Sequence, residues 1–411
     1  MLEQPAFGNR LRALRLERGL SQAAIAEGGL STGYLSRLES GMRQPNNRIV
    51  AHIAKRLGVP VSAFDEAQML SSLSEALAIA ASAPEGDDVV EILTQALHTD
   101  DNRNPVLRWQ ALWLLSRIRA DRGERSEEHV LLLELVGLSD KLGSRELGAR
   151  TRARLSRSVQ AMGDHARARE YAEEAHRMSA GLSLADKSEA LHALISAEAE
   201  TSQLTGARAH ARELCALTES AGGILHVKAL WASATVCIRQ ADYAEAQQVL
   251  ERALKGLDSH TDLMLWIQLR LAAASLYVQI TPRQTEQART MLDDIEPVID
   301  LVGTDLHNQQ NLTLQAHLAF AEGRIPDARA LSEQIDEQTT RLSDRDRVRF
   351  QALRSKLRIL DGHFEEGTRE LRQLAEQAQA VPNAELAAEI WRDLAETLAG
   401  AYGRGGRADQ A

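Results

Sequence analysis

Apolar residues recur at helical spacing along almost the whole chain. Near the N-terminus, Phe7, Leu11 and Leu14 occupy one face of a predicted helix, and a later helix ends at Leu57, where Gly58 follows. No window shows the strict alternation of apolar and polar residues that a half-buried strand requires. The pattern therefore predicts an all-α protein.

Two short helices joined by a tight turn are predicted within residues 19–45. Ser21 and Ser31 stand where a side-chain hydroxyl accepts a hydrogen bond from the free N–H groups of a new helix. Gly28 and Gly29 permit the turn, because glycine adopts backbone angles denied to other residues. The apolar positions are spaced to pack one helix across the other: Ile25, Ala26, Leu30, Leu35 and Leu38. This is the pattern of a DNA-reading helix-turn-helix, in a domain that ends near Phe64.

Several motifs in this segment resemble the Cro and phage-repressor (XRE) type of DNA-binding domain. They are Arg-Leu-Arg-x-Leu-Arg at 10–15, Gly-Leu-Ser-Gln at 19–22, Tyr-Leu-Ser-Arg-Leu-Glu-x-Gly at 34–41, Pro45, and Leu-Gly-Val at 57–59. The resemblance covers about residues 6–65. It implies a five-helix helix-turn-helix domain over residues 1–65 that binds double-stranded DNA, with a structural ion pair between Arg15 and Glu39.

The same resemblance implies which side chains contact DNA. Arg37 on the third helix is the expected base reader in the major groove, since a guanidinium donates two hydrogen bonds to one guanine. Gly33 departs from many relatives, which have a polar residue there, so direct readout is expected to be limited. Tyr34 is expected on sugar or a thymine methyl, and Arg43 on a phosphate. The full predicted set is Gln22 (on a phosphate), Thr32, Gly33, Tyr34, Ser36, Arg37 and Arg43.

Charge separates the N-terminal segment from the rest of the chain. Residues 1–65 carry nine Lys and Arg against five Asp and Glu, a net charge of +4. The whole chain has a net charge of −10, so the remaining residues carry −14. A basic domain on an acidic body favours phosphate contact by that domain alone.

The downstream sequence repeats about every forty residues. The pattern of residues 66–82 predicts an amphipathic connecting helix. Together with the polar turn that follows it, this helix forms a predicted linker over residues 66–88. Beyond it, a turn residue is followed five positions later by a small residue that lets a neighbouring helix approach closely. These pairs are Gly163 and Ala168, Gly206 and Ala211, Ala241 and Ala246, Arg283 and Ala288, Gly323 and Ala328, and Gly362 and Gly367.

Two of the repeats, at 163–172 and 241–246, resemble tetratricopeptide repeats. The resemblance implies a right-handed α-solenoid of six or seven helix pairs over residues 89–411, a sensor and dimerisation domain capped by residues 383–402. The first helix of each pair would line the concave face, at 187–203, 224–239, 263–279, 305–321 and 345–361. The candidate effector-binding residues on that face are aromatic rings and amides: Trp231, Trp266, Gln268, Asn308, Asn311 and Gln315.

Motifs that carry enzyme chemistry are absent from the sequence. It contains no glycine-rich phosphate loop, no His-Glu-x-x-His, no Cys-x-x-Cys and no Gly-x-Ser-x-Gly. Cys215 and Cys237 lack metal-ligand spacing and are expected to be reduced core thiols. We therefore expect no enzymatic activity, no cofactor and no metal site. The lack of a long apolar stretch or an N-terminal leader favours a cytoplasmic protein without membrane contact.

The order of the two predicted domains resembles the peptide-pheromone-responsive regulators called the RRNPP family. The resemblance implies a homodimer in which an effector, most favourably a short signalling peptide of a quorum-sensing system, binds the repeat domain and changes DNA binding. A small molecule or a partner protein is an alternative effector. In the other alternative, the chain is a DNA-bound adaptor whose repeat domain holds a partner protein permanently.

Overall fold

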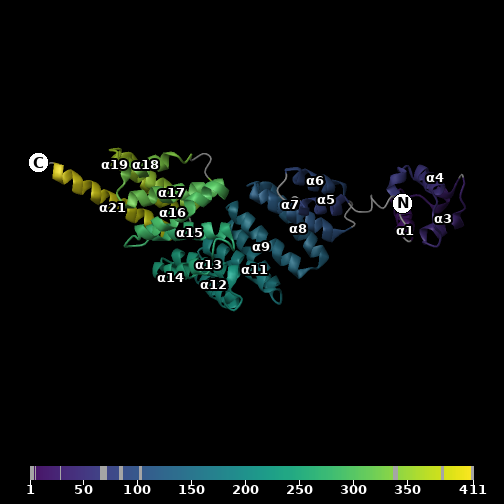
Figure 1. Cartoon of the computed structure of the whole chain (residues 1–411), viewed down its shortest axis with the longest axis horizontal. Coiled ribbons are helices and arrows are strands. Elements are labelled where there is room, and N and C mark those ends of the chain that lie inside the picture. Colours follow the sequence, from purple (N-terminus) through teal and green to yellow (C-terminus); the bar gives the residue numbers. More distant parts are fainter. Residues whose placement is uncertain are drawn as a thin grey trace. The chain divides into compact units, whose positions relative to one another are not determined.

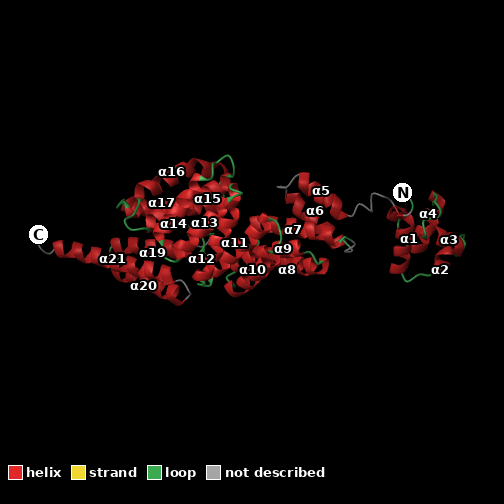
Figure 2. Ribbon diagram, turned by 90° about the horizontal axis from the view of Figure 1, so that it is seen from below, coloured by secondary structure: helices red, strands yellow, loops and turns green. Residues whose placement is uncertain are grey.

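The computed structural model describes residues 4, 6–27, 29–64, 72–82, 87–100, 104–336, 341–380 and 384–408. Residue contacts divide the chain into two units, Met1–Leu142 and Gly143–Ala411. Within the described residues every regular element is a helix, and Figure 2 draws no strand. The all-α prediction is confirmed. None of the described helices has both the length and the apolar character needed to cross a bilayer.

The N-terminal domain consists of four α-helices and a closing 3₁₀ helix (Figure 1). These are α1 (Ala6–Glu17), α2 (Gln22–Ala26), α3 (Thr32–Glu39), α4 (Asn47–Leu57) and η1 (Val61–Phe64). The fifth expected helix is thus a single 3₁₀ turn. Phe64 on that turn packs against Phe7 of α1 with ring centroids 5.1 Å apart, and both rings are fully buried. This contact joins the first and last elements of the domain.

Side-chain caps set the helix starts that the sequence predicted. Ser21 Oγ accepts a hydrogen bond from the backbone N–H of Ala24 at 3.2 Å, and Ser31 Oγ accepts one from the backbone of α3 at 3.1 Å. Gly58 ends α4 in the left-handed conformation, with φ of 66°. Gly28, which the sequence placed in the turn, lies outside the described residues.

The first unit continues with two helix pairs. Helix α5 (Ser72–Ser82) packs on α6 (Asp87–Thr99) and on α7 (Pro105–Asp121), and α7 packs on α8 (Arg125–Leu142). Of the connecting helix expected over 66–82, residues 66–71 lie outside the described part of the chain. Its role as a connector stays a prediction.

The second unit is a succession of helix pairs in which each helix packs against the one before it (Figure 1). The helices are α9 (Arg145–Ala161), α10 (His165–Ser179), α11 (Leu184–Glu200), α12 (Leu204–Glu219), α13 (Gly223–Arg239), α14 (Tyr243–Lys255), α15 (Leu263–Gln279), α16 (Thr285–Val302), α17 (Asp305–Ala321), α18 (Ile325–Glu333), α19 (Asp344–Leu360), α20 (Phe364–Ala380) and α21 (Ala384–Ala408). First helices also contact one another, as α9 does α11 and α15 does α17. The prediction of tetratricopeptide-like helix pairs is confirmed.

Small residues stand near the start of the second helix of each pair. Ala168, Ala246, Ala288 and Ala328 are fully buried. At Gly367 an added Cβ atom would lie 2.6 Å from a backbone carbonyl oxygen of α19, which cannot move aside cheaply. Small side chains are therefore a packing requirement at these positions.

One repeat has a different register from the predicted one. The predicted turn residue, Gly206, lies inside α12. The turn residue is Ser202, with φ of 58°, and the fully buried small residue five positions later is Ala207. The prediction was wrong because a serine rarely adopts the left-handed conformation, so a nearby glycine was the favoured turn residue.

We predict that Ala246→Leu, which adds volume at a fully buried position of α14, lowers the free energy of unfolding by about 1–3 kcal/mol. Ala244→Leu makes the same change at an exposed position of the same helix and is expected to alter it by less than about 0.5 kcal/mol. Urea unfolding followed by circular dichroism measures both. Equal effects of the two substitutions would show that helices do not approach closely at position 246.

Candidate functional site

Helix α3 has one face in the domain core and the other exposed. Leu35 and Leu38 are fully buried, whereas four residues of the predicted DNA-contact set on this helix are exposed: Thr32, Gly33, Ser36 and Arg37. Arg37 Nε donates a hydrogen bond to the carbonyl oxygen of Gly33 at 3.1 Å, which leaves its terminal nitrogens for a base edge. A Cβ atom at Gly33 would meet nothing within 4 Å, so packing inside the domain does not require glycine there.

Tyr34 and Arg43 lie together beside this exposed face. The guanidinium carbon of Arg43 is 4.6 Å from the centroid of the Tyr34 ring, within the range of a cation–π contact. The carbonyl oxygen of Arg43 accepts a hydrogen bond from Gln4 Nε2 at 2.6 Å. The structure therefore holds a positive charge next to the predicted recognition helix, and contact of Arg43 with a phosphate stays a prediction.

Glu39 joins α3 to the two helices before it. Its carboxylate oxygens accept hydrogen bonds from Arg15 Nε at 2.7 Å and from Gln22 Nε2 at 2.8 Å, so the predicted ion pair with Arg15 is confirmed. Burial alone raises the pKa of Glu39, but the hydrogen bonds from Arg15 and Gln22 outweigh burial and hold that pKa below its usual value. The amide of Gln22 has a second hydrogen, which remains available for the predicted phosphate contact.

A cavity of about 360 Å³ lies within the second unit. Its wall is formed mainly by α13, α15, α17, α19 and α21, and the first four of these helices are among those that the tetratricopeptide resemblance placed on the concave face. This volume is typical of a ligand pocket, for which about 300–1,000 Å³ is usual. Large apolar side chains supply much of the wall: Trp231, Leu271, Val278, Leu314, Phe320 and Ile390.

Two buried polar atoms of the cavity wall have no hydrogen-bond partner among the described residues. They are Oε1 of Gln279 on α15 and Nε2 of His317 on α17. Burial lowers the pKa of His317 to about 3, so its imidazole is neutral at physiological pH. An amide oxygen accepts hydrogen bonds, and a neutral imidazole nitrogen donates or accepts according to tautomer. The wall therefore offers unsatisfied polar groups to a bound molecule.

The part of the wall that α19 and α21 form is charged. Lys356 Nζ lies 2.6 Å from an oxygen of Asp393, and a terminal nitrogen of Arg349 lies 2.8 Å from an oxygen of Glu389. Burial by itself lowers the pKa of Arg349, but attraction to Glu389 outweighs burial and raises that pKa above its usual value. These ion pairs hold α21 against α19 and complete the cavity.

Glu385 connects the start of α21 to helices that come much earlier in the chain. It accepts a hydrogen bond from the hydroxyl of Tyr243 on α14 at 3.1 Å and pairs with Arg345 and Arg349 of α19. Burial and the neighbouring carboxylate charge raise the pKa of Tyr243 to about 12, so its hydroxyl stays protonated and donates. One carboxylate thus joins residues 142 positions apart in sequence.

Two of the six residues predicted to bind an effector, Trp231 and Gln268, line the cavity. Trp266 does not, and its ring instead packs on the guanidinium of Arg270, 3.6 Å from the ring centroid. All three residues lie on first helices, α13 and α15. Their role in effector binding stays a prediction.

The other three predicted residues lie on α17 and are likewise not part of the cavity wall. Asn308 is exposed, and Gln315 donates to Glu296 at 3.4 Å. Asn311 is buried, and its Oδ1 has no hydrogen-bond partner in the described part of the chain. The cavity-wall residues missed by sequence reasoning include Gln279, His317, Arg349 and Lys356. A signal was present for Lys356, which lies on the same face of α19 as the apolar Leu353 and Leu357.

Residues 11–64 match a protein-family model described as helix-turn-helix. This match confirms the helix-turn-helix prediction and identifies the N-terminal segment as a DNA-binding domain, a class without enzymatic activity. No curated protein matches the chain. The domain and the repeats together define a helix-turn-helix protein with a tetratricopeptide-like unit.

The chain is also similar in fold to solved structures of helical-repeat proteins. A Rap protein complexed with Competence and Sporulation Factor aligns with a TM-score of 0.55 and 10% identity, over 97% of this chain and 99% of that chain. PlcR of Bacillus thuringiensis, in complex with the peptide PapR7 and DNA, aligns with a TM-score of 0.37 and 13% identity, over 66% and 98% of the two chains. The likeness to the Rap protein establishes the fold alone. The predicted resemblance to RRNPP regulators is therefore confirmed for the fold, and for the fold alone.

We predict that Glu39 makes the stability of α1–α3 depend on pH. Because its pKa is lowered from 4.5 by folding, its stabilising contribution is present above about pH 4.5 and is lost as the pH falls below that value. Glu39→Gln is expected to reduce protection of these helices from amide hydrogen exchange at pH 6 by about tenfold, and to flatten the acid dependence.

Glu27→Gln is the matched control, since Glu27 is exposed and its ion pair with Arg56 lies on the surface. It is expected to leave both the protection and its pH profile unchanged. If protection in Glu39→Gln still fell with pH as it does in the wild type, the pH dependence of stability would belong to groups other than Glu39.

Proposed function

We propose that this chain is a homodimeric transcription regulator that binds specific double-stranded DNA through residues 1–65 and an effector through its repeat domain, residues 89–411. The observation that carries the proposal is the presence, in one chain, of a helix-turn-helix with an exposed recognition face and a cavity with unsatisfied polar groups. Residues 66–88 would transmit the effect of the ligand to the DNA-binding domain.

A short signalling peptide is the favoured effector. A peptide presents backbone N–H and C=O groups together with apolar side chains. The cavity wall has complementary groups, with large apolar side chains beside the unpaired atoms of Gln279 and His317. The Rap protein of the same fold is described in complex with Competence and Sporulation Factor, and PlcR in complex with a peptide. The likeness to the Rap protein supports the fold, and the choice of a peptide depends on the cavity.

Dimerisation would let a small rearrangement control DNA binding. A symmetric dimer contacts two half-sites about one helical turn of DNA, or a multiple of it, apart. An effector shifts the dimer between competent and incompetent arrangements only if it binds one of them more tightly. The cavity wall is formed mainly by five alternate helices of the second unit, α13, α15, α17, α19 and α21, so a ligand would contact several repeats at once.

We predict that Arg37→Ala lowers the affinity for the operator by about 1–3 kcal/mol and relaxes the preference at one base pair, because it removes a bidentate contact to guanine. Lys55→Ala removes the same charge from an exposed position of α4 and is expected to weaken specific and non-specific DNA binding equally. Footprinting on the chain's own upstream region, followed by binding titrations, measures both. If Arg37→Ala kept the wild-type base preferences, Arg37 would not be a base reader.

For the effector, we predict that the peptide-sized fraction of spent culture medium changes the operator footprint of the wild-type protein. Prior digestion of the fraction with a broad-specificity protease is expected to abolish the change. Ala272→Phe narrows the cavity from a half-buried wall position and is expected to abolish the response while preserving basal DNA binding. Ala244→Phe, at an exposed position, is the control and is expected to respond as the wild type does.

A response that survives protease treatment would favour a small molecule. A footprint indifferent to every fraction would favour the DNA-bound adaptor that holds a partner protein. Either result would leave the DNA-binding assignment unchanged, since that assignment is tested by the footprint of the wild-type protein without any added fraction.

A further inference from the structure

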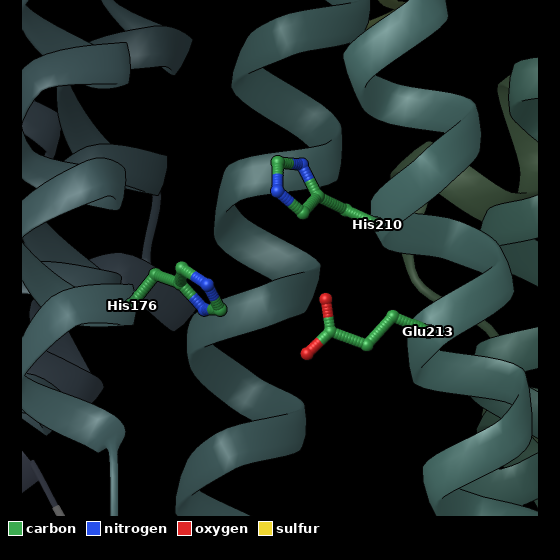
Figure 3. Close-up of side chains that lie close together, drawn as sticks. All are labelled: His176, His210 and Glu213. Atoms are coloured by element: carbon green, nitrogen blue, oxygen red, sulfur yellow. The ribbon is translucent and has the colours of Figure 1, made fainter.

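A cluster of metal-ligating side chains lies in the second unit outside the cavity wall. We propose that His176 on α10 and His210 and Glu213 on α12 form a Zn²⁺ site that joins two successive helix pairs. Figure 3 shows the three side chains pointing toward one another from two helices. No metal site was expected from the sequence, because the three side chains form no motif on a single helix and come together only in the folded chain.

The positions of the three residues follow from the helix geometry. His210 and Glu213 are three residues apart on α12 and therefore lie on the same face of that helix. His176 reaches them from α10, and the centroids of the two imidazole rings are 5.6 Å apart. One ligand atom from each residue lies within 4.8 Å of the others. The folded chain thus brings one potential ligand atom of each residue close to the other two.

A buried carboxylate orients one of the imidazoles. Glu198 on α11 is buried, and its Oε2 lies 2.8 Å from Nδ1 of His210. A carboxylate at this distance favours a proton on Nδ1, which leaves the lone pair of Nε2 for a metal ion. Carboxylate, histidine and metal in this order is the usual outer-shell arrangement of a zinc site.

Gly206 makes room for that carboxylate. It lies one turn before His210 on α12, and an added Cβ atom at this position would be 2.9 Å from Glu198 Oε1. A side chain here would displace the group that holds His210. The second imidazole, on His176, has a buried Nδ1 with no hydrogen-bond partner among the described residues, so metal binding would not break an existing contact of that atom.

The ligand set favours Zn²⁺. Two imidazole nitrogens and one carboxylate oxygen, with a fourth position open to water, are typical of three-ligand zinc sites. Metal–ligand bonds of about 2.0–2.1 Å in a tetrahedron place the ligand atoms about 3.4 Å apart. The separations of up to 4.8 Å are therefore closed by side-chain rotation, for which the exposed Glu213 is free.

Binding of Zn²⁺ would link the α9–α10 pair to the α11–α12 pair through side chains on their second helices. In a repeat protein, stability depends on the contacts between neighbouring repeats as well as on each repeat. An ion that binds only the folded arrangement raises the thermal stability of the protein by mass action. The site is independent of the effector cavity, and so is its test.

The experiment uses the purified full chain, stripped of metal by a chelator that is then removed. Isothermal titration with ZnCl₂ is expected to show one ion per chain, and a thermal melt is expected to shift upward with Zn²⁺. Titration with Co²⁺ is expected to give visible absorption of a nitrogen- and oxygen-ligated ion without the intense near-ultraviolet band of a thiolate ligand. A thiolate band would assign the ion to Cys215 or Cys237 and overturn the proposal.

Two variants test the proposed Zn²⁺ ligands, and a third tests the residue that positions His210. His176→Ala and Glu213→Gln are each expected to weaken Zn²⁺ binding by at least tenfold and to remove the thermal shift. Glu198→Gln tests a positioning residue and is expected to weaken binding by about tenfold with the one-to-one stoichiometry kept. Glu219→Gln, an exposed carboxylate on the same helix, is the matched control and is expected to bind as the wild type does.

Glu213 is exposed, so Glu213→Gln tests the site without disturbing the core. Circular dichroism of each variant without metal establishes that it is folded. Wild-type affinity in both His176→Ala and Glu213→Gln, or no binding to the wild-type chain, would overturn the proposal.

Discussion

The close approach of neighbouring helices is the constraint on which the second unit depends. An amphipathic helix pair of this length cannot bury its apolar face alone, and it becomes stable only when the next pair covers that face. Buried small residues such as Ala168, Ala246 and Gly367 bring the helix backbones near enough for this to happen. This stacking sets the spacing of the side chains that line the cavity and of the metal-ligating side chains His176, His210 and Glu213.

Local chemistry made the DNA-binding domain the most predictable part of the chain. Caps by Ser21 and Ser31, and the left-handed Gly58, each act within a few residues of the helix end that they define. The ion pair between Arg15 and Glu39 was available from the family resemblance. By contrast, Ser202 takes a conformation that its residue type disfavours, and no local signal revealed it.

Residues that meet only after stacking were the hardest to predict. Trp231 was predicted as an effector-binding residue because it lies on a first helix, and it lines the cavity. Asn308 also lies on a first helix but is not part of the cavity wall, because the face that a helix turns toward the cavity depends on how the pairs pack. His317 and His176 looked like scattered polar residues in the sequence. Their surroundings come from helices that are distant along the chain, which a periodicity argument does not combine.

The hydrogen bond from Tyr243 to Glu385 gives the second unit a topology unlike that of an open stack of repeats. Contacts in a simple repeat array are short in sequence, so unfolding spreads from one repeat to the next as along a line. The hydrogen bond between residues 142 positions apart adds a long-range contact to these neighbour contacts. Unfolding of α21 therefore also removes a contact that stabilises α14. The hydrogen bond between Tyr243 and Glu385 thus couples the last helix of the array directly to its middle.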